Sequence, residues 1–246
     1  MSASPSLLIL GATSGMARAV ARRYAAAGYS LILAGRDVAE MERDAADLAL
    51  RGAPMVACHT FDALDLASHA AFLAGLGETP DMALCAVGFM ADQAACDADP
   101  ALADRVARSN FNGPAHILSL IGSAMAARGA GMIVGISSVA GDRGRKSNYS
   151  YGAAKAGFTA FLSGLRGRFA AQGVHVMTVK PGFVRTRMTA GMDLPAALTA
   201  DPAEVAEAIF VAARKGRNVI YVKPVWRLIM AIIRAIPEPV FKKLSI

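Results

Sequence analysis

Short apolar runs alternate with helical stretches along the whole chain, which has 246 residues. A strand covered on both faces of a parallel sheet reads as a continuous apolar run, whereas a half-exposed strand alternates. We therefore predict an α/β fold in which one doubly wound parallel sheet of about seven strands carries helices on both faces. No repeat or linker divides the chain. The strands are expected at Leu7–Leu10, Ser30–Ala34, Met55–Cys58, Met82–Ala86, Met132–Ser137, Val174–Val179 and Asn218–Val222.

A glycine-rich turn, Gly11-Ala-Thr-Ser-Gly15-Met-Ala17, follows the first apolar run and precedes a helical pattern. The N-terminus of a helix presents free backbone N–H groups and binds anions. Gly11 would allow the tight turn, Gly15 would let the backbone approach a pyrophosphate, and Ala17 would let the helix pack on the strand. The spacing differs from the common G-x-G-x-x-G fingerprint, so the turn alone is weak evidence for a dinucleotide site.

Tyr151 and Lys155 are four residues apart in a predicted helix, and Ser138 precedes the tyrosine by thirteen residues. Positions i and i+4 share a helix face, so the ammonium would lie beside the phenol. A neighbouring positive charge lowers the pKa of a tyrosine toward the range in which it exchanges protons efficiently. Tyr149 lacks such a partner, because its i+4 neighbour is Ala153. Taken alone, the pair also fits an incidental contact on a surface helix.

Together, the glycine turn and the serine, tyrosine and lysine resemble the short-chain dehydrogenase/reductase family, and the resemblance covers nearly the whole chain. It implies one NAD(P)-binding Rossmann domain over residues 1–246, a homodimer or homotetramer, and hydride transfer between a nicotinamide cofactor and a small carbonyl or alcohol. The family's catalytic residues match Asn110, Ser138, Tyr151 and Lys155. Its cofactor contacts match Gly11, Thr13, Ser14, Gly15, Met16, Arg36, Asp62, Gly88, Tyr151, Lys155, Pro181, Gly182, Val184 and Thr186.

The resemblance also implies a role for each catalytic residue. Lys155 would bond the nicotinamide ribose and lower the pKa of Tyr151, which would donate the proton. Ser138 would polarise the carbonyl, and Asn110 would hold a water that relays the replacement proton. One family motif is altered: Cys85-Ala-Val-Gly88 stands where Asn-Asn-Ala-Gly is usual, and only its glycine is kept.

The end of the second predicted strand bears on the choice of nicotinamide cofactor. An NAD site usually has an acidic residue there that bonds the ribose hydroxyls, but this chain has Gly35-Arg36-Asp37. The planar, permanently charged guanidinium of Arg36 suits a phosphate, so we predict that NADP(H) is preferred over NAD(H). Alternatively, Arg36 is merely solvated and Asp37 caps the next helix. Asp62 matches the family's adenine contact, although it also fits a helix cap.

The net charge of +7 is confined to the end of the chain. Eight basic residues and one acidic residue lie between Arg214 and Ile246, so this part accounts for the whole excess. Within the segment of about residues 223–246, Val225–Ile236 places Arg227 and Arg234 on one helix face. Another face carries Trp226, Ile229, Ile233 and Ile236.

Such a helix suits a membrane interface, and it is far shorter than the roughly 20 residues that span a bilayer. An isoleucine-rich face does not suit bases, so no nucleic-acid partner is expected. The alternative is that this helix packs on the catalytic core or on a partner subunit.

A closer resemblance is to the reductases of lipid-linked keto-sugars, typified by the decaprenyl-phosphoryl 2-keto-erythro-pentose 2-reductases. Besides the tail, it rests on Cys85–Gly88, Gly141–Asn148 and Pro181–Arg187. It implies a lipid-linked carbonyl substrate. Its phosphate could be bound by Arg143, Arg145 and Lys146, or these three residues could simply be solvated. A reductase of fatty-acyl, steroid or other apolar alcohols stays open, as does a regulatory or scaffold protein that binds the cofactor without turnover.

Three further features concern the substrate and the compartment. Met188–Ala200 carries several apolar residues and predicts a mobile lid that accepts many shapes. Cys58, Cys85 and Cys96 are irregularly spaced, which indicates reduced thiols and neither a disulfide framework nor a metal site. Met1–Ser6 lacks the basic start and apolar core of a signal peptide, so a cytoplasmic protein is expected, with contact at the inner membrane face left open.

Overall fold

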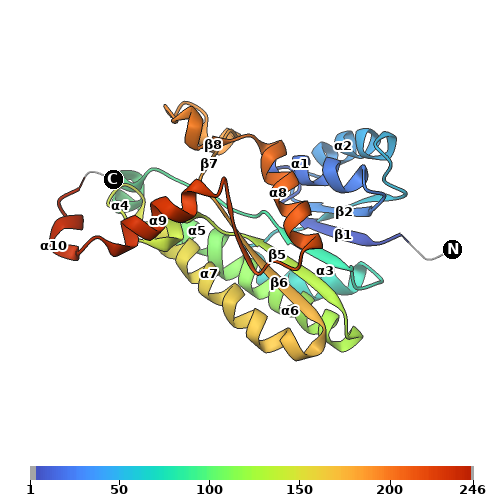
Figure 1. Ribbon diagram of the computed structural model, residues 1–246. Helices are drawn as coiled ribbons and strands as arrows, with labels where there is room; N and C mark the ends of the chain where they lie inside the picture. Colours follow the sequence, from blue (N-terminus) through green and yellow to red (C-terminus); the bar gives the residue numbers. More distant parts are fainter. Residues whose placement is uncertain (1–3, 245–246) are drawn as a thin grey trace.

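A single parallel sheet runs through the protein in the computed structural model, which describes residues 4–244 (Figure 1). Part of the N-terminal segment considered above, and the last two residues of the basic tail, lie outside this range. The strand order is β3-β2-β1-β4-β5-β6-β9, so the predicted seven-stranded Rossmann fold is confirmed. The strands are β1 Ser6–Leu10, β2 Ser30–Gly35, β3 Val56–Thr60, β4 Met82–Cys85, β5 Gly131–Ile136, β6 Val174–Pro181 and β9 Val219–Val222.

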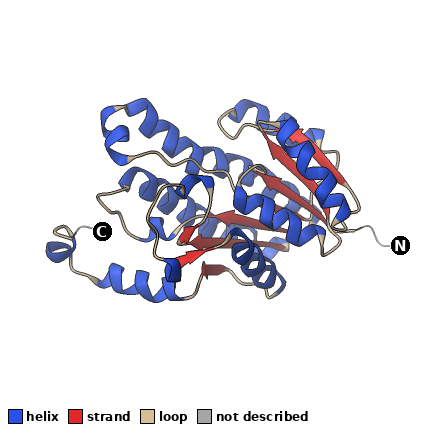
Figure 2. Ribbon diagram, turned by 90° about the horizontal axis from the view of Figure 1, so that it is seen from above, coloured by secondary structure: helices blue, strands red, loops and turns tan. Residues whose placement is uncertain are grey.

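Helices cover both faces of this sheet, as Figures 1 and 2 show. In β1, Leu7 and Ile9 point into the core on one face while Leu8 and Leu10 point into the core on the other. All four side chains are fully buried, which explains why the strand reads as an unbroken apolar run. One face carries α1 Gly15–Ala25, α2 Val38–Leu50 and α8 Pro202–Arg214, and the other carries α3 His69–Gly75, α6 Gly113–Arg128 and α7 Tyr149–Phe169.

The strand order reverses between β1 and β4, because β2 and β3 extend the sheet on one side and β5, β6 and β9 on the other. In open α/β sheets, ligands bind beyond the carboxyl ends of the strands at this switch point. The glycine turn follows β1 there. Two short helices, α4 Gln93–Ala98 and α5 Pro100–Ala107, follow β4 on the same side.

A second, two-stranded sheet closes the base of the predicted lid. β7 Phe183–Val184 pairs in parallel with β8 Thr199–Ala200, so the intervening residues 185–198 leave the body of the protein and return to it. Met188 and Met192 are exposed within this segment. The predicted lid, Met188–Ala200, ends inside β8, so we call the excursion itself, residues 185–198, the lid.

The C-terminal segment forms α9 Val225–Ala235 and α10 Glu238–Phe241 (Figure 1). Trp226 and Met230 are buried against Val139, so the packing alternative is correct for this face of α9. The opposite face leaves Leu228 and Ile232 more than half exposed, at 63% and 58%. The apolar face available to a membrane is therefore not the one expected from the sequence. Within residues 4–244, no helix has the length and apolar character needed to cross a bilayer.

Candidate active site

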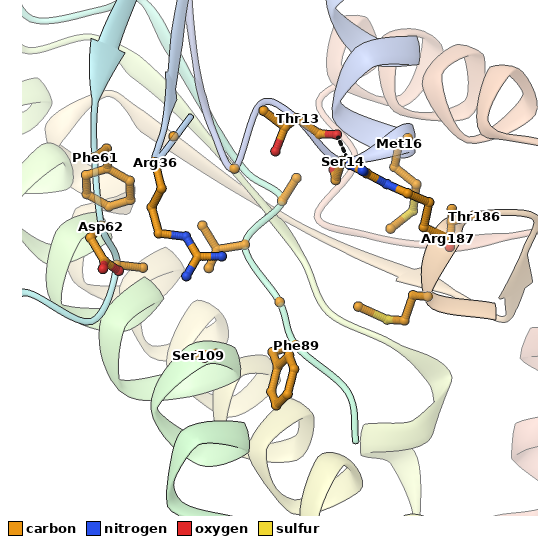
Figure 3. A pocket seen from close by; sticks show the side chains of 18 of the residues that line it. Thr13, Ser14, Met16, Arg36, Phe61, Asp62, Phe89, Ser109, Thr186 and Arg187 are labelled. Atoms are coloured by element: carbon orange, nitrogen blue, oxygen red, sulfur yellow. Dashed lines mark hydrogen bonds between the residues drawn. The ribbon is translucent and has the colours of Figure 1, made fainter. Parts of the chain in front are cut away.

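A cleft of about 310 Å³ opens at the carboxyl ends of the strands beside the glycine turn (Figure 3). Gly11 has φ +78°, and a Cβ there would lie 3.0 Å from the backbone nitrogen of Val87, so only glycine fits. Ser14 caps α1 by accepting a hydrogen bond of 3.2 Å from the backbone N–H of Ala17. The predicted cofactor contacts that line this cleft are Gly11, Thr13, Ser14, Gly15, Met16, Arg36, Asp62, Gly88 and Thr186.

Arg36 extends into the cleft from the end of β2, and no carboxylate within residues 4–244 forms an ion pair with it. Asp37 is the N-cap of α2, where its carboxylate accepts a hydrogen bond of 2.8 Å from the N–H of Glu40. Asp62 uses its carboxylate locally, because it accepts 2.9 Å from the N–H of Leu64. The arginine is therefore available to a ligand, whereas both aspartates already stabilise their own turns.

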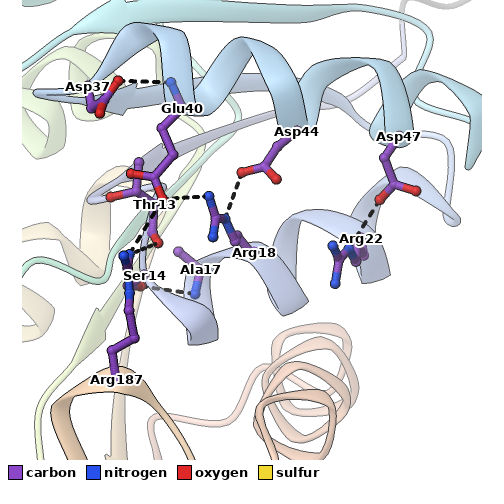
Figure 4. A network of polar contacts seen from close by, with 10 residues as sticks. All are labelled: Thr13, Ser14, Ala17, Arg18, Arg22, Asp37, Glu40, Asp44, Asp47 and Arg187. Carbon is purple, nitrogen blue, oxygen red and sulfur yellow. Dashed lines mark hydrogen bonds and ion pairs between the residues drawn. The ribbon is translucent and has the colours of Figure 1, made fainter.

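Two arginines that the sequence interpretation missed also line this cleft. Arg187, at the start of the lid, donates 3.1 Å to the carbonyl of Thr13 and lies 3.5 Å from the carboxylate of Glu40 (Figure 4). Arg105 of α5 stacks over the ring of Phe89, with its guanidinium carbon 4.3 Å from the ring centre. Arg187 directly follows Thr186, a predicted cofactor contact, so its position in the sequence was a signal. Arg105 reaches the cleft only through tertiary folding and has no such signal.

Ser138, Tyr151 and Lys155 come together from two elements that meet beyond β5. Ser138 follows the strand and accepts a hydrogen bond of 3.1 Å from the N–H of Ala140, which fixes its hydroxyl at the start of a short turn. Tyr151 is in the first turn of α7, and its hydroxyl is hydrogen-bonded to Ser138. Lys155 lies one turn further on, with Nζ 5.7 Å from the centre of the tyrosine ring.

The pKa values in this cluster differ from the sequence expectation. Burial raises the pKa of Tyr151 to about 12, and the hydrogen bond with Ser138 opposes this rise. The ammonium of Lys155 donates 3.1 Å to the carbonyl of Ile136 and not to the phenol. Burial lowers the pKa of Lys155 to about 8. The expected lowering of the Tyr151 pKa by Lys155 is therefore absent from this arrangement of the protein's own groups.

Asn110 is fully buried in a π-helical turn, Arg108–Asn112, a type of turn often found at functional sites. Its amide donates to the carbonyls of Phe89 and Val106, and its Oδ1 accepts 3.3 Å from the N–H of Phe89. The backbone uses both amide donors, so a water could be held only through Oδ1. A Cβ on Gly88 would lie 3.0 Å from that Oδ1 and 3.6 Å from Lys155 Nζ. Gly88 therefore allows these two residues to approach.

The other predicted cofactor contacts lie outside the set that lines the cleft: Tyr151, Lys155, Pro181, Gly182 and Val184. Pro181 ends β6, and Val184 is buried in β7. Gly182 faces the indole of Trp226, and a Cβ there would lie 2.0 Å from that ring. The glycine is therefore needed for contact with α9.

The three basic residues between Ser138 and Tyr151 have different environments. Arg143 donates to the carbonyls of Ile233 and Ile236, so it holds the C-terminal segment and is not free for a substrate phosphate. Arg145 is half-buried, and this desolvation lowers its pKa. Lys146 is exposed. The geometry therefore excludes Arg143 as a partner for a substrate phosphate.

Comparison with known proteins identifies the same class of protein that the fold and the site indicate. The family model for short chain dehydrogenases matches residues 6–195. An uncharacterised oxidoreductase from Streptomyces coelicolor is 39% identical in an alignment of 245 residues that covers 98% of this chain and 96% of that protein. One from Mycobacterium tuberculosis is 37% identical over 97% of this chain and 96% of its own length. The chain therefore belongs to the short-chain dehydrogenase/reductase family.

Solved structures of related proteins have the same fold. A short chain dehydrogenase/reductase family protein superposes with a TM-score of 0.79 at 31% identity, covering 89% of this chain and 95% of its own. A candidate gluconate 5-dehydrogenase from Beutenbergia cavernae, solved with bound NADP, gives 0.82 at 27% identity over 92% and 98%. The protein is thus an NAD(P)-dependent oxidoreductase, and the alternative of a scaffold without turnover is set aside.

Proposed function

We propose that the protein is an NADPH-dependent reductase that converts a ketone of a lipid-linked or otherwise apolar substrate to a secondary alcohol. The observation that carries the proposal is the cluster of Ser138, Tyr151 and Lys155 beyond the carboxyl end of β5. This cluster adjoins the cleft through Gly88, which lines the cleft and whose added Cβ would lie 3.6 Å from Lys155 Nζ.

The residues of the cleft fit a nicotinamide dinucleotide. The side-chain-free surfaces of Gly11 and Gly15 and the capped N-terminus of α1 form a cradle for a pyrophosphate. Lys155 has three donors and gives one to Ile136, which leaves two for ribose hydroxyls. When bound, the cofactor supplies a hydride to the carbonyl carbon of the substrate.

The protein's own groups supply position and a proton. Ser138, held by the N–H of Ala140, donates a hydrogen bond to the carbonyl oxygen and orients it. With a pKa of about 12, Tyr151 is protonated at neutral pH and donates its proton to the same oxygen as charge develops there. Asn110 is assigned to hold, through Oδ1, a water that returns the proton.

A preference for NADP(H) over NAD(H) is supported by charge. Arg36, Arg105 and Arg187 all line the cleft, and the first has no carboxylate partner within residues 4–244. A 2′-phosphate adds up to two negative charges at neutral pH, which a planar guanidinium can bind with two hydrogen bonds. The bound NADP in the related Beutenbergia structure supports the same choice.

A lipid-linked substrate at an anionic membrane surface is supported by the outer face of α9. Leu228 and Ile232 project there, and Arg227 and Arg234 are exposed on the same helix. Three free thiols, at Cys58, Cys85 and Cys96, support a reducing, cytoplasmic compartment. A homodimer or homotetramer remains part of the proposal, on the precedent of the family. A fatty-acyl or steroid ketone is the second candidate, because the exposed Met188 and Met192 of the lid suit any large apolar group.

The test is the oxidation of NADPH and NADH with matched carbonyl compounds: a lipid-phosphate-linked keto-sugar, the same keto-sugar without its lipid, a fatty-acyl ketone and a steroid ketone. The proposal expects NADPH to be oxidised fastest with the lipid-linked keto-sugar. Equal rates with and without the lipid would show that the enzyme does not recognise the lipid part of the substrate. A preference for fatty-acyl or steroid ketones would favour the second candidate.

A further inference from the structure

Trp226 lies where three parts of the active site meet. Its indole covers Gly182, the residue after β6, and stacks edge-on against Phe183 with the ring centres 5.3 Å apart. The same side chain belongs to a buried apolar cluster with Met230 and Val139, the residue that directly follows Ser138. Its Nε1–H donates a hydrogen bond of 3.0 Å to the carbonyl of Leu198, at the end of the lid. Trp226 is 5% exposed, so these contacts are shielded from water.

The helix that carries Trp226 is also fixed to the segment between Ser138 and Tyr151. Arg143 donates 2.6 Å to the carbonyl of Ile233 and 2.6 Å to that of Ile236, at the C-terminal end of α9. Positive side chains stabilise a helix there, because the last carbonyls lack partners within the helix. Arg143 also pairs with Glu238 at 2.9 Å and stacks over Phe241, 3.6 Å from the ring centre.

The lid is attached at both ends. At its start, Arg187 bonds the carbonyl of Thr13 in the glycine turn, while at its end Leu198 is bonded by Trp226. The starting end lines the cofactor cleft through Arg187 and Met188. The position of the far end depends on α9, which carries Trp226, so a movement of α9 would shift the lid relative to Ser138.

We propose that Trp226 is a positioning residue for carbonyl reduction, which fixes the lid relative to the Ser138 turn and so sets the substrate side of the site. This rests on the proposed reductase activity. The indole ring covers Gly182 and is part of the cluster that contains Val139, and its N–H supplies the attachment of the lid. The C-terminal segment is thus part of the active site as well as a surface element.

The test compares Trp226→Phe with Met230→Ala in the full-length protein. Phenylalanine keeps an aromatic ring against Gly182 but removes the N–H that holds Leu198. Met230 is 1% exposed on the same face of α9 and has no hydrogen bond to the lid, so its truncation removes an apolar contact of the helix but keeps the hydrogen bond from Trp226 to Leu198. The measurements are KM and kcat for a soluble ketone, KM for NADPH, Tm, and the rate of tryptic cleavage after Arg187 with NADPH bound.

Trp226→Phe is expected to raise the ketone KM and the cleavage rate about three- to tenfold, the effect of one hydrogen bond, with the NADPH KM unchanged. Met230→Ala is expected to lower Tm at least as much while leaving the ketone KM and the cleavage rate near the wild-type values. If both variants change these quantities in proportion to Tm, or if neither variant changes them, the proposal is overturned. If the wild type reduces no ketone, the reductase proposal fails, and the cleavage rates still decide the role of Trp226 in holding the lid.

Discussion

Lys155 lies 5.7 Å from the centre of the Tyr151 ring, yet it donates its hydrogen bond to the carbonyl of Ile136. The two side chains share a helix face, as their spacing predicts. Burial raises the pKa of the tyrosine and lowers that of the lysine, so it disfavours the charged form of each. The protein alone therefore holds a neutral phenol beside an ammonium that is easily deprotonated.

The pKa of Lys155 predicts the pH dependence of cofactor capture. Because its pKa is lowered to about 8, Lys155 is charged below that pH and neutral above it. Tyr151 stays protonated throughout this range, with a pKa of about 12. We expect kcat/KM for NADPH, which reports on the free enzyme, to fall as the pH rises through about 8. A profile that stays level well above pH 9 would show that Lys155 keeps its charge.

The role of Arg36 predicts a selective effect on NADPH. Arg36→Ala should raise the KM for NADPH roughly ten- to a hundredfold, because a charge-assisted hydrogen bond contributes about 1.5–3 kcal/mol. The KM for NADH should change little, since that cofactor lacks the 2′-phosphate. Arg43→Ala on the exposed side of α2 is the control for loss of a charge. Equal effects of Arg36→Ala on both cofactors would exclude recognition of the phosphate.

The contact between Gly182 and Trp226 can be followed by fluorescence, since the chain has one tryptophan. A Cβ at position 182 would lie 2.0 Å from the indole, so Gly182→Ala must displace the ring toward solvent. We expect a red-shifted emission, a lower Tm and slower turnover. Gly164→Ala, in the exposed interior of α7 where an added Cβ meets nothing within 4 Å, should leave emission and turnover unchanged and should not lower Tm, because alanine favours a helix over glycine. An unshifted emission in Gly182→Ala would contradict the described packing.

The outer face of α9 predicts binding to anionic vesicles. Basic residues near an anionic leaflet contribute about 1 kcal/mol each, so co-sedimentation should weaken as salt is raised. Changing both Leu228 and Ile232 to serine should reduce it roughly tenfold or more, because the apolar contact is lost, without affecting reduction of a soluble ketone.

Truncation after Pro224 would not isolate the membrane contact, since it would also uncover Val139 and Gly182 and so impair activity. Full-length protein that stays in the supernatant at low salt would exclude the membrane contact.

Much of the fold could be predicted because it depends on local patterns. Continuous apolar runs mark strands buried on both faces, and the glycine turn after the first run marks the cofactor end of the sheet. Tyr149 could be set aside from spacing alone, and it indeed lies 47% exposed, bonded to Asp97.

The remaining features depend on contacts between segments that are distant in sequence. An amphipathic pattern shows that α9 has a face to bury, but the position of Val139 and Gly182 decides that Trp226 and Met230 form it. The capture of Arg143 by the carbonyls of Ile233 and Ile236 has no local signal either.

The most direct test of the account is NADPH oxidation with an activated ketone by the wild type, Tyr151→Phe and Tyr149→Phe, together with NADPH binding to each. The wild type should turn over, and Tyr149→Phe should behave like it. Tyr151→Phe should bind NADPH normally but lose about 10²- to 10⁴-fold in kcat, the usual contribution of a proton donor. A Tyr151→Phe enzyme as active as the wild type, or a larger loss in Tyr149→Phe, would contradict the assignment of Tyr151 as the proton donor.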